Sequence, residues 1–87
     1  MDQKLLGQRL RLCREQGGWS QATIAQQAGI IQGDLSLLER GEKHIWADTL
    51  YRLAETLGIS TDYLLGFTDN PTPPAKRPRP RTTTPVG

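Results

Sequence analysis

Residues 21–40 constrain the fold of this chain more than any other stretch. A small residue, Ala25, stands at the fifth place of this segment, and a glycine, Gly29, stands at the ninth. Two short helices can cross at a steep angle only if their contact point is nearly bare and the turn can adopt a positive φ. Ala25 meets the first condition and Gly29 meets the second. The spacing therefore predicts a helix-turn-helix.

Proline and charge divide the chain near residue 70. All six prolines lie within residues 71–85, and residues 1–70 contain none. Residues 1–70 carry seven basic and nine acidic side chains, a net charge of −2, whereas residues 71–87 carry four basic and no acidic ones, so the total is the formal +2. A proline-free stretch permits helices, and a Pro-rich, basic one cannot form a core. We therefore expect an all-α domain over residues 1–69 and a disordered tail over residues 70–87.

Five helices are expected within the domain, from the spacing of apolar residues and from the glycines that end each run. Asp2, Ser20 and Ser60 are suitable N-caps for the first, second and fifth, whereas Ile31 stands where a Ser or Thr would usually cap the third. The predicted helical segments are residues 3–16, 21–28, 32–40, 47–56 and 61–65.

The two tryptophans and the apolar residues near position 65 can lie either in the core or on the surface. We expect Trp19 to pack in the core and Trp46 to pack on the fourth helix. The candidate dimer surfaces are the exposed part of the fifth helix and residues 64–67, although some of Tyr63, Leu64 and Phe67 must instead close the core.

Composition excludes several classes of protein. One cysteine permits no internal disulfide, no apolar run approaches the roughly 18–20 residues of a membrane span, and the N-terminus lacks the apolar core of a signal peptide. We therefore expect a cytoplasmic chain with no membrane partner. One His, one Cys and no paired carboxylates or glycine-rich phosphate loop argue against an enzyme, a metal site or a cofactor.

Residues spread over positions 4–66 together point to one protein family. They are Arg9, Leu10, Arg11, Arg14, Ser20, Gln21, Ala25, Gly29, Leu35, Leu38, Glu39, Gly41, Leu50, Ala54, Leu57, Gly58, Asp62, Tyr63, Leu64 and Leu65. Taken in order, these residues resemble the phage-repressor/Cro-type (Xre-like) helix-turn-helix DNA-binding domain family. The resemblance implies a compact, lambda-repressor-like five-helix domain. It also implies a transcriptional regulator, expected to be a repressor, that binds double-stranded DNA at a pseudo-palindromic operator as a homodimer.

The resemblance assigns a structural role to one pair and a DNA contact to one glutamine. Arg14 and Glu39 match a buried ion pair between the first helix and the end of the third, and a planar guanidinium suits a fixed carboxylate. Gln21 matches a glutamine that opens the second helix and contacts a phosphate or a base. Gln21 could also be a solvated polar residue.

The resemblance places the helix over residues 32–40 in the major groove of DNA. Gln32 can pair with adenine, whereas Gly33 has no side chain and Asp34 repels phosphate unless it faces a cytosine amino group. The sequence therefore predicts few direct base contacts. The expected DNA-contacting positions, with Gln21, are Gln32, Gly33, Asp34, Ser36 and Leu37 on that helix and Lys43 and His44 in the loop after it.

Two further hypotheses concern the basic tail and the face of the third helix that carries Leu37. The basic tail can lie along phosphates or in a narrow minor groove, or it can be a solubilising linker. Alternatively to DNA binding, the same fold could be a protein-interaction module, antitoxin-like or an accessory subunit, which uses the face that carries Leu37. The tail residues expected to contact phosphate are Lys76, Arg77, Arg79 and Arg81.

Overall fold

The computed structural model describes residues 1–73, and these residues form five helices and no strand. The all-helical prediction is thereby confirmed, with two boundaries moved by one residue. The third helix ends at Glu39 and not at Arg40, and the fourth continues to Leu57 and not only to Thr56, shifts that are usual at helix ends. The helices are α1 (Gln3–Gln16), α2 (Gln21–Ala28), α3 (Gln32–Glu39), α4 (Ala47–Leu57) and α5 (Thr61–Leu65).

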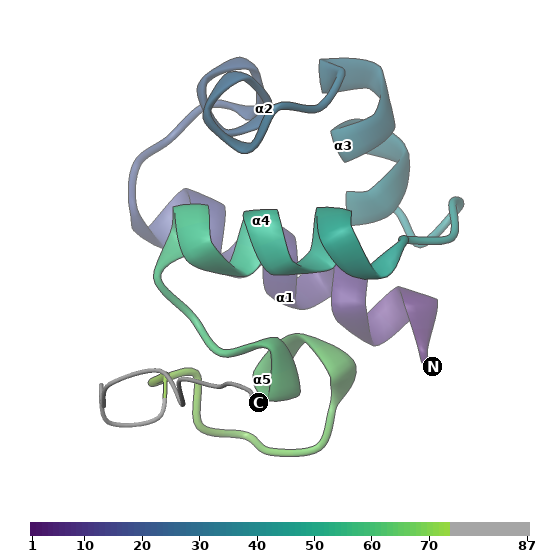
Figure 1. The fold of residues 1–87 in the computed structure, drawn as a ribbon, viewed down its shortest axis with the longest axis vertical. Helices are drawn as coiled ribbons and strands as arrows, with labels where there is room; N and C mark the ends of the chain where they lie inside the picture. The colour runs from purple at the N-terminus through teal and green to yellow at the C-terminus, as the bar shows by residue number, and fades with distance from the viewer. Residues whose placement is uncertain (74–87) are drawn as a thin grey trace, which may run out of the picture.

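The helices enclose one apolar core. In Figure 1, α2 and α3 lie together on one side, α1 and α4 cross the middle, and α5 lies on the other side. Packing contacts join α1 to α3 and α5, α2 to α3 and α4, and α4 to α5. Buried apolar area is the main source of stability in such a domain. The buried apolar residues are Leu6, Leu10, Ile24, Ala25, Ala28, Leu35, Leu38, Leu53, Ala54, Leu57, Tyr63 and Leu64.

The turn between α2 and α3 has the predicted geometry. Ala25 is 2% exposed, and Gly29 adopts the left-handed conformation with φ 73°. The amide of Ile30 donates a hydrogen bond to the carbonyl of Ala25 at 2.9 Å. This bond closes the end of α2, so the chain can reverse into α3 within a few residues.

Side chains cap three of the five helices. Asp2 Oδ1 accepts from the Leu5 amide at 3.0 Å, and the hydroxyls of Ser20 and Ser60 accept in the same way at the starts of α2 and α5. By contrast, α3 and α4 follow Ile31 and Trp46, which make no side-chain cap bond. The predicted caps are therefore all present, and the expected weakness at the start of α3 is present too.

The expectations for the two tryptophans were wrong. Trp19 is 39% exposed, because its ring lies across Gly17, which has no Cβ to hold the ring away. Trp46 is 76% exposed, because it precedes the first turn of α4, whose buried residues all lie in the second half of the helix. Of the residues that follow, Tyr63 and Leu64 close the core, and Phe67 is 79% exposed.

The chain stays against the domain for a few residues beyond position 69. The amide of Ser60, at the start of α5, donates to the carbonyl of Pro71 at 2.9 Å. Residues 70–73, expected to belong to the tail, therefore follow the junction between α4 and α5. Within residues 1–73, no helix has both the length and the apolar character that crossing a membrane requires.

Candidate nucleic-acid interface

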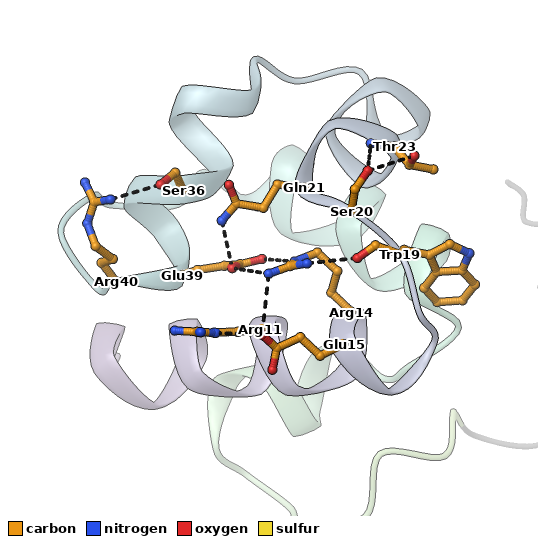
Figure 2. A network of polar contacts seen from close by, with 10 residues as sticks. All are labelled: Arg11, Arg14, Glu15, Trp19, Ser20, Gln21, Thr23, Ser36, Glu39 and Arg40. Atoms are coloured by element: carbon orange, nitrogen blue, oxygen red, sulfur yellow. Dashed lines mark hydrogen bonds and ion pairs between the residues drawn. The ribbon is translucent and has the colours of Figure 1, made fainter.

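The C-terminal end of α3 is held by a buried ion pair. Arg14 Nε donates to Glu39 Oε2 at 2.6 Å, and Arg14 Nη2 donates to Glu39 Oε1 at 3.0 Å, so the contact is bidentate (Figure 2). The Glu39 side chain is 3% exposed and that of Arg14 is 12% exposed. The hydrogen bond to Glu39 raises the pKa of Arg14 against the opposing effect of burial. The expected pair therefore joins α1 to α3.

The same carboxylate receives a donor from α2. Gln21 Nε2 donates to Glu39 Oε1 at 3.0 Å, and Arg14 Nη1 donates to the carbonyl of Trp19 at 2.8 Å (Figure 2). The network therefore ties the start of α2, the end of α1 and the end of α3 together. One amide N–H of Gln21, expected to bind DNA, is thus used inside the protein. An amide nitrogen has two N–H donors, so the other is left for a phosphate.

Gly7 brings the backbone of α1 directly against the same end of α3. A Cβ at this position would fall on the carbonyl oxygens of Leu38 and Glu39, so only glycine fits without a shift of the helices. Sequence reasoning missed this contact. A signal was present, because a glycine within a helix costs about 1 kcal/mol of helix propensity and is usually retained for close packing.

The first turn of α3 is exposed. Ile31 is 72% exposed, and Gln32 and Gly33 are also exposed. No atom lies within 4 Å of the position that a Cβ on Gly33 would occupy. Solvent therefore surrounds the beginning of α3, at the opposite end of the helix from Glu39.

Two polar residues of α3 already have partners within the protein. Asp34 Oδ1 lies 3.8 Å from Lys43 Nζ, and Arg40 Nη1 donates to Ser36 Oγ at 3.0 Å. Lys43 therefore offsets the negative charge that makes Asp34 unfavourable near phosphate. Arg40, which sequence reasoning did not select, adds a positive charge beside Ser36, although its Nε also contacts Glu42 at 3.3 Å.

Leu37 and His44 differ in exposure. Leu37 is only partly exposed, whereas His44 is exposed in the loop after α3. His44 also lines a shallow hollow with Lys43 and Trp46. The structure therefore brings Lys43 and His44 close to the exposed start of α4, and it offers little of Leu37 to any partner.

Arg9 is a second residue whose role sequence reasoning missed. Its Nη1 donates to the carbonyls of Tyr63 and Thr68 at 2.6 and 2.7 Å, and its Nη2 lies 2.7 Å from Asp69 Oδ1. The guanidinium carbon also lies 4.2 Å from the centre of the Tyr63 ring, within cation–π range. A charged residue between Leu6 and Cys13 on the apolar stripe of α1 was the available signal.

Cys13, the one cysteine of the chain, is partly buried. Cys13 packs against the core, and burial raises the pKa of its thiol, while the charge of Arg9 opposes that shift. Within residues 1–73, no group of three His, Cys, Asp or Glu side chains could hold a metal ion. The four basic tail residues expected to contact phosphate, Lys76, Arg77, Arg79 and Arg81, lie outside the described residues.

Comparison with known proteins identifies the class. Residues 7–67 match the family described as "Helix-turn-helix domain", and the chain belongs to that family. The resemblance predicted from the sequence is thereby confirmed. The match covers α2, the turn, α3, α4, α5 and most of α1, which are the elements that hold the exposed first turn of α3.

Two known proteins show how far the similarity extends along the chain. The "HTH-type transcriptional regulator ImmR" of Bacillus subtilis (strain 168) is 39% identical over 61 residues, which are 70% of this chain and 48% of ImmR. This chain therefore matches about half the length of that relative. The "restriction-modification controller protein C.AhdI" of Aeromonas hydrophila superposes with a TM-score of 0.70 at 33% identity, over 72% of this chain and 96% of C.AhdI.

A third similar structure is that of a DNA-binding domain. The "DNA-binding domain of the P22 C2 repressor" superposes with a TM-score of 0.68 at 32% identity, over 75% of this chain and 86% of that domain. This chain thus shares its fold with proteins that are named as a controller and as a repressor.

Proposed function

We propose that this chain is a sequence-specific DNA-binding transcriptional regulator, and specifically a repressor, that places α3 in the major groove. One observation carries the proposal: the network of Arg14, Gln21 and Glu39 fixes the buried end of α3, while the first turn of the helix is exposed. A helix that is held rigidly at one end and exposed at the other can contact base edges with little loss of entropy on binding. The names of the relatives support the same function.

Three kinds of contact would operate in the complex. Gln32 pairs with adenine through its amide, and the second N–H of Gln21 binds a phosphate. Lys43 and Arg40 offset the charges of Asp34 and Glu42 beside α3, and their N–H groups can also bind phosphates without selecting a sequence. The tail residues Lys76, Arg77, Arg79 and Arg81 would extend these phosphate contacts along the DNA.

The chain would act as a homodimer in the cytoplasm. α3 has eight residues, so one copy contacts too few base pairs to select a site. Two copies related by a two-fold axis double the contacted sequence and require a pseudo-palindromic operator. Phe67, which is 79% exposed after α5, is the best candidate for the contact between copies, because Tyr63 and Leu64 are buried.

The alternative protein-interaction module gains less support. That hypothesis relied on Leu37, and Leu37 is only partly exposed. An interface residue that contributes substantially to binding needs most of its apolar surface free to be buried. Selection of bound DNA fragments separates the two hypotheses.

Selection of bound fragments from the source genome, with the full chain at moderate salt, tests the proposal. We expect enrichment of a pseudo-palindromic site that binds two copies of the chain. Gln32→Ala should weaken binding to that site by about tenfold, the usual effect of losing one bidentate base contact. Gln8→Ala is the matched control, because Gln8 is an exposed glutamine on α1, and it should bind as the wild type does. No enriched fragment, with a partner protein retained on the chain instead, would overturn the proposal.

A further inference from the structure

Ile31 has an unfavourable place within the isolated domain. It occupies the N-cap position of α3, makes no side-chain cap bond, and leaves 72% of its surface exposed. A Ser or Thr at this position would supply the missing cap, as Ser20 and Ser60 do elsewhere in the chain. The described part of the domain therefore shows no stabilising contact that explains an aliphatic side chain at this position.

The neighbours of Ile31 restrict what it can contact. Ile31, Gln32 and Gly33 are consecutive exposed residues, and the position of the missing Gly33 side chain is empty. Without that side chain, nothing at residue 33 holds the backbone away from a surface that docks on the first turn of α3. A docked surface would therefore meet Ile31 and Gln32 together.

The major groove has only one apolar group that suits such a side chain. Its base edges present hydrogen-bond donors and acceptors, and the C5-methyl of thymine is the exception. Burying an aliphatic group against a polar edge leaves that edge without a partner, which is unfavourable. Contact with the methyl buries apolar surface on both sides and leaves no polar atom unsatisfied.

We propose that Ile31 is a specificity-determining residue that contacts a thymine C5-methyl at the base pair next to the adenine bound by Gln32. The inference rests on the proposed function and deepens it, because it predicts A·T pairs where the beginning of α3 meets each half-site. Specificity there comes from an apolar contact and one amide, and not from a row of polar side chains.

The test removes the methyl group and nothing else. Each thymine of the selected operator is replaced in turn by deoxyuridine, which has the same pairing edges without the C5-methyl, and affinity for the full chain is measured. The wild type should lose about fourfold at one thymine of each half-site, the factor expected for one buried methyl group. Ile31→Ser should bind the unmodified operator less tightly and should no longer distinguish thymine from deoxyuridine at that position.

Two readouts separate a loss of contact from a loss of folding. Ile31→Ser supplies an N-cap, so its melting temperature should rise by a few degrees while its affinity falls. Trp46→Ser is the matched control, because Trp46 is also an exposed, uncapped residue at the start of a helix. That variant should keep the sensitivity to deoxyuridine.

The possible failures are distinct. If the wild type binds its operator and no single deoxyuridine weakens it, or if Ile31→Ser keeps the same sensitivity, the inference is overturned and DNA binding stands. If the selection yields no operator, the proposed function fails and the inference fails with it.

Discussion

The two ends of α3 differ in how many contacts they make with the rest of the domain. At the C-terminal end, Glu39 is buried, accepts hydrogen bonds from Arg14 and Gln21, and lies against Gly7 of α1. At the N-terminal end, Ile31 provides no cap and Gly33 has no atom near its missing side chain. The difference separates two tasks within one short helix: one end fixes the position of the helix, and the other is free to contact a ligand. Substitutions at the two ends should therefore differ in size and in sign.

The largest effect is expected from Glu39→Ala. This change leaves the Arg14 guanidinium and the Gln21 amide without their acceptor in a buried place, which typically costs about 3–5 kcal/mol. For a domain of this size, the melting temperature should fall by more than about 10 °C. Thermal unfolding followed by circular dichroism measures the change.

Glu42→Ala is the matched control for that experiment. Glu42 is a glutamate three residues further along, in an exposed ion pair with Arg40 at 3.3 Å. Exposed pairs contribute about 0–1 kcal/mol, so this variant should melt within a few degrees of the wild type. A Glu39→Ala variant that melts like Glu42→Ala would show that the C-terminal end of α3 is not held as described.

Gly7→Ala should have the next largest effect. Helix propensity alone favours alanine by about 1 kcal/mol. However, the added Cβ falls on two backbone carbonyls, which cannot move aside as a side chain can, so α1 and α3 must separate. We expect a net destabilisation of about 1–3 kcal/mol by urea unfolding. A stabilised variant would contradict the close approach of the two helices.

Gly33→Ala should give the smallest change, and with the opposite sign. The added Cβ meets open space, so the gain in helix propensity is not offset, and stability should rise by about 0.5–1 kcal/mol. Chemical denaturation of Gly33→Ala and Gly7→Ala, measured side by side, compares the two ends of α3 with the same substitution. A loss of stability at residue 33 would mean that the first turn of α3 packs against something within the domain.

The sequence allowed the local features of the fold to be predicted, because they depend on residues close in the chain. The five helices, the caps at Asp2, Ser20 and Ser60, and the turn at Gly29 all follow from the spacing of neighbours. The Arg14–Glu39 pair was also expected, but through the family resemblance.

The features that were missed depend on which faces of distant helices meet. The contact of Gly7 with the end of α3, and the bonds from Arg9 to α5 and to the loop after it, join residues more than thirty positions apart. The exposure of Trp19 depends on the position of its ring across Gly17, and that of Trp46 depends on the first turn of α4 lying outside the core. At the candidate site, the sequence predicted a DNA contact for Gln32 but indicated only a poor cap at Ile31, because exposure is a property of the folded chain.

The hydrogen bond from the Ser60 amide to the carbonyl of Pro71 has a practical consequence for anyone who shortens this chain. Ser60 is 8% exposed, and a buried amide needs an acceptor. A truncation that follows composition and ends at residue 69 would remove this acceptor at the start of α5. A minimal domain should therefore retain Pro71, because this hydrogen bond extends the folded unit past the point at which the amino-acid composition changes.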